Sequence, residues 1–75
     1  MTANEWIDAY AAELGTDPPS AEEFKAILDL AAEAAHASER VAAPVACWLA
    51  ASTGRSLDEV LAAARKIAAQ AGEGT

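Results

Sequence analysis

Apolar and polar positions follow helical spacing in three of the four segments into which the chain divides. The first segment, about residues 5–14, and the second, about residues 21–40, each place their apolar side chains on one side. The two stripes consist of Trp6, Ile7, Tyr10 and Leu14 in the first segment and of Phe24, Ile27, Leu28, Ala31, Ala34, Ala35 and Ser38 in the second. We therefore predict two amphipathic helices, of which the second is the longer and the central one.

The remaining two segments differ from each other in their apolar pattern. The third, about residues 44–52, is apolar on every side, so it must be enclosed by the bundle or covered by another chain. The fourth, about residues 57–71, carries a single core stripe formed by Leu57, Val60, Leu61, Ala64, Ile67, Ala68 and Ala71. Among the aromatic residues, Tyr10 and Trp48 are expected to anchor the core.

Helix boundaries are indicated by glycine, proline and serine. Gly15 and Gly54 fit helix ends, and Pro44 fits the first position of the third helix, which predicts a break at about residues 41–43. Capping boxes are expected at two helix starts, Ser20 with Glu23 and Ser56 with Glu59. The sequence therefore predicts an all-α fold, a compact bundle of about four helices that forms a single domain of residues 1–75.

The bundle is expected to have a small core. The chain has 75 residues and is 53% hydrophobic, but 22 of its residues are alanine, which adds little burial. A domain this short buries only roughly 60% of its unfolded surface. We therefore expect further burial against a partner or a second copy, with Val45, Trp48 and Leu49 of the apolar third helix as the candidate oligomer interface.

Charge and cysteine content exclude some classes of function. The net charge is −7 and the basic residues are few and scattered, so nucleic acid is not expected as a partner. Cys47 is the only cysteine, and with no signal peptide pattern at the start of the sequence this favours a cytoplasmic location. The longest apolar run, residues 41–51, is about half a membrane span and contains Pro44, so a membrane protein is not expected.

One polar stripe on the second helix contains the only histidine of the chain. Within about 80° of one another, on the side opposite the main apolar stripe, lie Lys25, Asp29, Glu33, His36 and Arg40. One interpretation is a solvated face in which Lys25 pairs with Asp29, and Glu33 with His36. Another is that Asp29, Glu33, His36 and Arg40 bind a protein partner. Both interpretations remain open from the residues alone.

The sequence gives less support for a metal site, a reactive cysteine or a serine that carries a prosthetic group. Glu33 and His36 have Glu-x-x-His spacing, but a di-metal bundle needs a second such pair, so no metal or cofactor is expected. Cys47 lies in an apolar run, where its thiol should stay protonated. Ser56 before Leu57 superficially resembles the attachment serine of an acyl carrier protein, but it begins the last helix and Arg55 stands in place of the expected aspartate. An N-cap role explains Ser56 sufficiently.

A family resemblance covers about residues 5–51. It is carried by Leu28-Asp29-Leu30-Ala31, Ala35-His36, Arg40 and Ala43-Pro44, with Glu5-Trp6 and Glu13-Leu14-Gly15 in the first helix. These residues resemble a family of small helical domains of unknown function in actinobacteria, found alone or fused to a molybdenum cofactor guanylyltransferase. Some members are labelled molybdopterin-guanine dinucleotide biosynthesis proteins. In that family the arginine is usually followed by proline, whereas Val41 follows Arg40 here.

The resemblance implies an association with molybdenum cofactor maturation without supplying a reaction, because in the fusions the other domain carries the nucleotide-transfer chemistry. We therefore expect no enzyme but an accessory module that docks a molybdenum cofactor guanylyltransferase or other protein through the second helix. The alternatives are a helical homodimer with a solvated polar stripe and, less favoured, an acyl-carrier-like protein.

Overall fold

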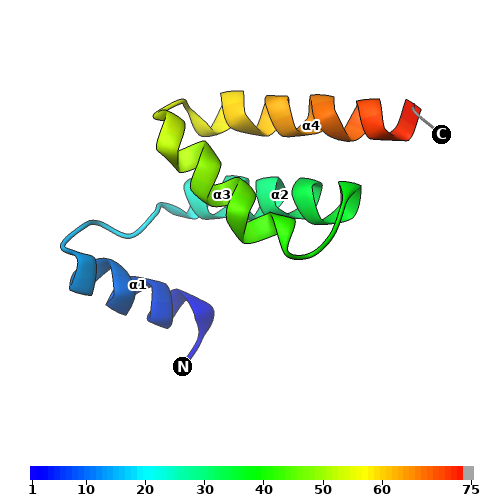
Figure 1. The fold of residues 1–75 in the computed structure, drawn as a ribbon. Helices are drawn as coiled ribbons and strands as arrows, with labels where there is room; N and C mark the ends of the chain where they lie inside the picture. Colours follow the sequence, from blue (N-terminus) through cyan, green and yellow to red (C-terminus); the bar gives the residue numbers. More distant parts are fainter. Residues whose placement is uncertain (74–75) are drawn as a thin grey trace.

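Four helices make up the part of the chain that the computed structural model describes, residues 1–73 (Figure 1). They are α1 (Ala3–Leu14), α2 (Ala21–Ala37), α3 (Ala42–Thr53) and α4 (Leu57–Glu73). Within residues 1–73 no strand is present. The predicted all-α bundle of about four helices is thus confirmed. Ala71, which we expected in the core stripe of the last helix, has a side chain outside the described part.

The expected caps at Gly15, Gly54 and Ser20 are formed, whereas the expected Ser56–Glu59 capping box has only the hydrogen bond from the Glu59 amide to the Ser56 hydroxyl. Gly15 and Gly54 end α1 and α3 with φ of 76° and 72°, a left-handed conformation that glycine adopts without a Cβ clash. At the start of α2 the Ser20 hydroxyl accepts from the Glu23 amide at 3.1 Å, and the Glu23 carboxylate accepts from the Ser20 amide at 2.8 Å. These bonds satisfy amides that have no partner inside the helix, so they fix where α2 begins.

One capping box was missed by the sequence analysis. Thr2 and Glu5 have the same spacing, and their reciprocal hydrogen bonds of 3.1 and 2.8 Å start α1 at Ala3 rather than near Glu5. The hydrogen bond from the Thr2 backbone amide lowers the pKa of the Glu5 carboxyl below its usual range. The signal was the Thr-x-x-Glu pattern at the very start of the sequence.

The turn between α2 and α3 differs from the prediction. The second helix ends at Ala37, so Arg40 lies in the turn and not on the helix. The Ser38 hydroxyl donates to the Ala34 carbonyl at 2.7 Å, and the Ser38 backbone is no longer helical, with φ −143° and ψ −101°. α3 begins at Ala42, two residues before the expected start at Pro44.

Pro44 nevertheless fits its position in α3. It is the third residue of the helix, where a backbone amide has no acceptor within the helix, so the missing N–H of proline costs no hydrogen bond. The amides of Ala42 and Ala43 donate to the carbonyls of Glu39 and Arg40 at 3.0 and 3.1 Å, which extends the helical turn toward α2. The turn residues therefore lead directly into α3.

α2 is the central helix, as predicted, because it packs against both α3 and α4. Leu30 of α2 and Leu61 of α4 are the large side chains that are buried in this three-helix body. α1 follows a separate course at one end of the molecule, joined to α2 by the extended segment 15–20 (Figure 1). Ala11 is its buried residue. The molecule is elongated, with extents of 44 × 25 × 18 Å.

Several side chains that we expected in the core are exposed. Tyr10 and Trp48, predicted to be core anchors, are 50% and 70% exposed. The same correction applies to other members of the predicted stripes, namely Trp6, Leu14, Leu28 and Ile67. The physical reason is that small side chains occupy the positions facing the body: in α3 these are the half-buried Ala46, Cys47 and Ala50. Bulkier residues on the other sides of α3 are left outside.

Candidate functional site

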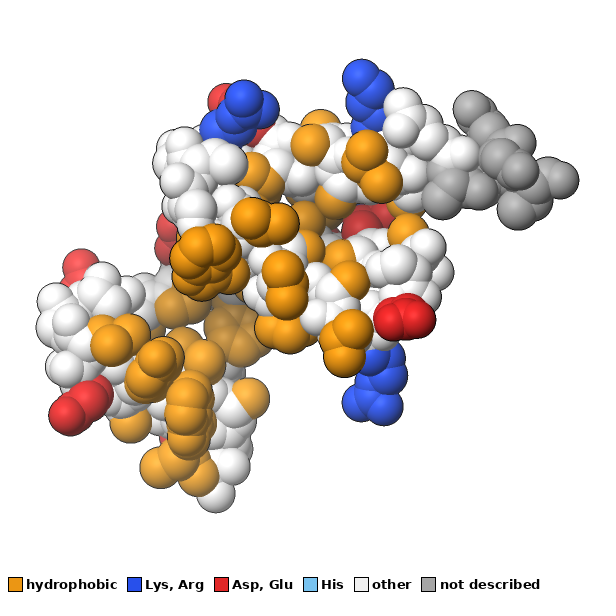
Figure 2. Space-filling view, viewed as in Figure 1, with side chains coloured by type: hydrophobic (Ala, Val, Ile, Leu, Met, Phe, Trp, Pro, Cys, Tyr) orange, Lys and Arg blue, Asp and Glu red, His pale blue; other side chains and the backbone are white. Residues whose placement is uncertain are grey.

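The main candidate is an exposed apolar surface, which we call the outer face. It comprises Trp6, Tyr10 and Leu14 on α1 and Val41, Val45, Trp48 and Leu49 at and within α3. Figure 2 shows hydrophobic side chains gathered over both helices on one side of the molecule. Each of these side chains is at least half exposed, although together they include both tryptophans of the chain. Exposed apolar side chains gathered in this number on one side of a small protein usually mark an interaction site.

Helical geometry aligns the α3 part of the outer face. Val41, Val45 and Trp48 are spaced four and three residues apart, which places them on one line along the helix, with Leu49 beside it. α3 contains no charged residue over its whole length, Ala42–Thr53. Its outward surface therefore offers apolar contact without a charge that a partner would have to desolvate or neutralise.

The α1 part of the outer face has an ordered aromatic pair. The rings of Trp6 and Tyr10 stack with centroids 4.9 Å apart and planes at 29°. Leu14 follows one turn later on the same side. α1 instead directs Ile7 and Ala11 inward, and these are its half-buried and buried residues. The stripe we predicted on α1 therefore exists, but most of it faces away from the body.

An apolar groove continues the surface between α3 and α4. It has a volume of about 320 Å³, and its lining includes Leu30 at the base and Leu49 and Ile67, both mostly exposed. A smaller cavity of about 170 Å³ lies between α2, α3 and α4 against Cys47 and Leu57. Spaces of this size next to the core are consistent with an incompletely packed body.

The polar stripe of α2 is divided among different neighbours. Lys25 Nζ lies 2.9 Å from Asp29 Oδ2, which is the surface pair we expected. Glu33, expected beside His36, instead faces α4, where Arg65 Nε lies 3.7 Å from Glu33 Oε1. Both ion pairs are partly or largely exposed and are worth little to stability. Asp29 and Glu33 thus already have charged neighbours within the chain.

His36 and Arg40 are the more accessible members of the stripe. Both are exposed, His36 in the last turn of α2 and Arg40 in the turn that follows. Among residues 1–73 neither makes an ion pair. Because α2 ends at Ala37, the two side chains do not share one continuous helix face as predicted, but both are available at the α2–α3 corner.

The residues considered for covalent or metal chemistry have ordinary structural surroundings. The Ser56 hydroxyl accepts from the Glu59 amide at 3.2 Å, the N-cap role expected for it. Cys47 is half-buried, its thiol lies 4.0 Å from the Ile27 carbonyl oxygen, and burial raises the pKa of that thiol. Within the described part of the chain no group of three or more His, Cys, Asp or Glu residues is placed to hold a metal ion.

The sequence analysis missed the α1 residues Trp6, Tyr10 and Leu14 as part of a candidate surface. Their spacing is the same whether a stripe faces a core or a partner, so periodicity alone assigned them to the core. The available signal lay in the neighbouring segment. Gly15 ends α1 and two consecutive prolines follow at 18 and 19, which favours an extended connection that carries the helix away from the body.

These features define a small, all-α, acidic domain whose largest apolar side chains face outward. The chain belongs to the family described as domain of unknown function (DUF6457), whose model matches residues 1–74. This confirms the expected small domain of unknown function. No curated protein and no solved structure matches the chain. None of the helices in residues 1–73 has the length and apolar character needed to cross a bilayer.

Proposed function

We propose that this protein is a non-catalytic interaction module that acts by binding another protein. The observation that carries the proposal is the distribution of large apolar side chains: Trp48 is 70% exposed, whereas the buried hydrophobic residues are Ala11, Leu30 and Leu61. A domain that leaves its tryptophans outside and its core small gains stability and specificity by association. The module therefore acts by binding, and aromatic and aliphatic side chains supply the binding surface.

The partner that we propose is a molybdenum cofactor guanylyltransferase. This rests on the resemblance of the α2 and α3 residues, including His36, Arg40 and Pro44, to actinobacterial domains that occur fused to such enzymes. A domain fused to an enzyme in one protein is a reasonable candidate to bind that enzyme as a separate chain in another. The half-buried single cysteine, for which no disulfide partner exists in the chain, supports a reducing cytoplasmic setting.

We propose that the enzyme docks at the α2–α3 corner. His36 and Arg40 are exposed there and supply directional hydrogen-bond donors, and the guanidinium of Arg40 suits a carboxylate on the partner. Asp29 and Glu33, on the same stripe, contribute less because Lys25 and Arg65 already neutralise them. Recognition at this corner is therefore polar and directional, in contrast to the apolar outer face.

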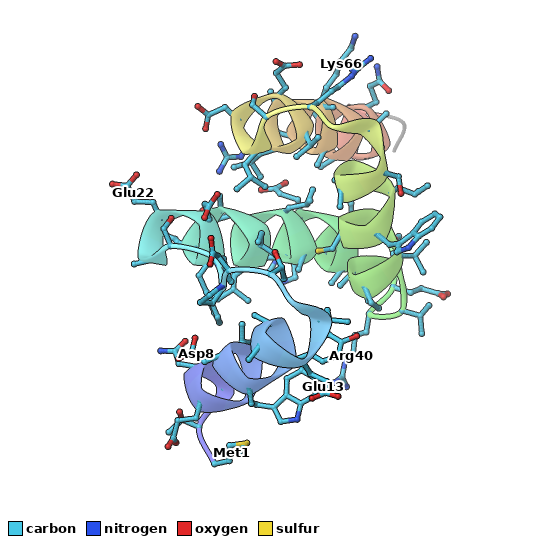
Figure 3. All side chains as sticks on the ribbon, turned by 90° about the vertical axis from the view of Figure 1, so that its left-hand side faces the viewer. Met1, Asp8, Glu13, Glu22, Arg40 and Lys66 are labelled. Carbon is cyan, nitrogen blue, oxygen red and sulfur yellow. The ribbon has the colours of Figure 1, made fainter. Side chains whose placement is uncertain are left out.

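Isothermal titration of the protein into a purified molybdenum cofactor guanylyltransferase from the same cell tests this proposal. We expect saturable binding, and we expect the His36→Ala/Arg40→Ala double variant to bind at least about tenfold more weakly, since hydrogen bonds to charged groups contribute ~1.5–3 kcal/mol. Lys66→Ala is the matched control, because Lys66 points away from the bundle on α4 (Figure 3). Absence of binding, or equal affinity of the double variant and wild type, contradicts the proposal.

A further inference from the structure

We infer that the outer face is covered by a second copy of the same chain, so that the working unit of the interaction module is a two-fold dimer. This rests on the proposed function and names the occupant of the apolar surface. The arrangement of that surface is the starting point. The α1 and α3 parts of the outer face are presented on the same side of the molecule (Figure 2), so one partner surface reaches both.

The exposed area of the single chain is too large for a folded monomer of its mass. A 7.7 kDa monomer is expected to expose about 4,300 Å² of surface. This chain exposes 5775 Å², an excess of about 1,400 Å². A stable interface covers about 800 Å² on each partner. The excess is thus sufficient for one interface of ordinary size, and the outer face contributes to it together with the elongated shape and other exposed apolar side chains such as Leu28 and Ile67.

The charge distribution is compatible with a second copy. Each chain carries a net charge of −7, so two copies attract only if the contact itself avoids the carboxylates. α3 meets this condition, since none of its residues from Ala42 to Thr53 is charged. Asp8 on α1 and Glu22 on α2 point to the side of the molecule opposite α3 (Figure 3). These two carboxylates are therefore directed away from the contact, whereas Glu13 of α1 lies toward the side of α3 (Figure 3), and the uncharged surface of α3 itself is directed into the contact.

A two-fold contact also suits the residues on the outer face. An isologous interface needs one surface that is complementary to itself, and an uncharged helix meets this requirement because it brings no like charges together. Trp48 lies on the α3 line with Val45 one turn before it, so each tryptophan can pack against the aliphatic side chains of the other copy. The same contact closes the groove beside Leu49.

Dimerisation through the outer face leaves His36 accessible, whereas Arg40 directly precedes Val41 of the outer face and lies between α3 and α1 (Figure 3). α2, which carries His36, lies behind α3 when the outer face is viewed (Figure 1), and Figure 3 shows the same order of the two helices from the side. A dimer built in this way presents two copies of the α2–α3 corner. It therefore binds two enzyme molecules, or one two-fold symmetric enzyme with increased avidity.

Sedimentation equilibrium of the full chain tests the dimer. We expect wild type to dimerise below about 100 μM, and we expect Trp48→Ser and Val45→Glu each to weaken dimerisation by at least about tenfold. Both positions are exposed, so circular dichroism should show unchanged helicity at low concentration. His36→Ala and Lys66→Ser are controls that should remain dimeric.

The results separate the two proposals. A wild type that stays monomeric at about 100 μM, or a dimer unaffected by both outer-face variants, overturns the assigned interface. A dimer that is lost in Trp48→Ser and retained in His36→Ala supports it, whether or not the enzyme binds. Loss of enzyme binding with an intact dimer bears only on the docking corner.

Discussion

Leu30 and Trp48 occupy opposite environments in the same small protein. Leu30 lies where α2 meets α3 and α4 and is 4% exposed, whereas Trp48, a larger apolar side chain on α3, is 70% exposed. Residue type therefore does not decide which side chain is buried here. The position of a side chain on its helix decides whether it is buried. The side of α3 toward the body consists of small residues that allow close approach, and the side away from the body carries the larger side chains. Stability resides in the first region, and we place function in the second.

α1 extends the same comparison to a whole helix. α2 and α4 pack along their length, whereas α1 contributes mainly Ala11 and the half-buried Ile7 to burial. Its ends are nevertheless well defined, by the Thr2–Glu5 box and by Gly15. Local signals thus form α1 where tertiary contacts contribute little. A helix with that balance receives little stabilisation from packing within the chain.

The largest expected effect is a difference in the free energy of unfolding between a variant of the core and a variant of the outer face. Leu30→Ala should lower the free energy of unfolding by about 3 kcal/mol, because it leaves a cavity among three helices. Trp48→Ala should change it by less than about 1 kcal/mol when the protein is dilute, because the side chain is already exposed. Urea denaturation followed by circular dichroism at low protein concentration measures both. A Trp48→Ala variant that loses more than Leu30→Ala would reverse the comparison.

The next largest effect on stability distinguishes a helix cap in the three-helix body from the equivalent cap on α1. Ser20→Ala removes the capping box of the central helix and should cost about 1 kcal/mol of global stability. Thr2→Ala removes the equivalent box of α1, and its effect should remain local, as faster hydrogen exchange of α1 amides with a nearly unchanged urea midpoint. Equal shifts of the midpoint in both variants would show that α1 unfolds together with the body.

A smaller effect is expected at the ion pair between α2 and α4. Arg65→Ala should lower the free energy of unfolding by ~0.5 kcal/mol or less, because both partners are partly in water and the closest N–O distance is 3.7 Å. Thermal denaturation of this variant beside Leu61→Ala, which removes a buried neighbour on the same helix, gives the comparison. A loss from Arg65→Ala that approached the Leu61→Ala value would mean that the pair is part of the core.

The smallest effect concerns pH and is confined to the start of α1. Since the hydrogen bond from the Thr2 amide lowers the pKa of Glu5 in the folded state, the cap stabilises α1 at neutral pH. That stabilisation is lost as the pH falls through the lowered pKa. NMR titration should give a Glu5 pKa below the usual glutamate range in wild type and a less lowered one in Thr2→Ala, because that variant loses the hydrogen bond of the Thr2 side chain and keeps the backbone amide. A wild-type Glu5 pKa that is not lowered would contradict the observed capping geometry.

Much of the fold could be predicted because its signals are local. Ser20, Gly15 and Gly54 mark helix boundaries through bonds and backbone angles that involve only neighbouring residues. The end of α2 was harder to predict. It is set by the Ser38 hydroxyl, which donates to the Ala34 carbonyl while the helix does not continue. A serine in that place is compatible with both outcomes, and the short turn to α3 decides between them.

The candidate site could be predicted only in part. The sequence indicated Val45, Trp48 and Leu49 through the absence of any polar side on α3, and the structure places all three outside, available for the proposed interface. Trp6 and Tyr10 were assigned to the core because an apolar stripe carries no information about what covers it. Glu33 was assigned to a free polar stripe because the approach of α4 to α2 is a tertiary feature.

Acrylamide quenching of tryptophan fluorescence tests most directly the claim that the outer face is a protein-binding surface. Trp6 and Trp48 both lie on it, and neutral acrylamide is not repelled by the acidic chain. We predict that quenching weakens as the protein concentration rises from about 1 to about 100 μM, and that Trp6→Phe, which retains only Trp48, behaves in the same way. Quenching that stays constant over this range would contradict the account.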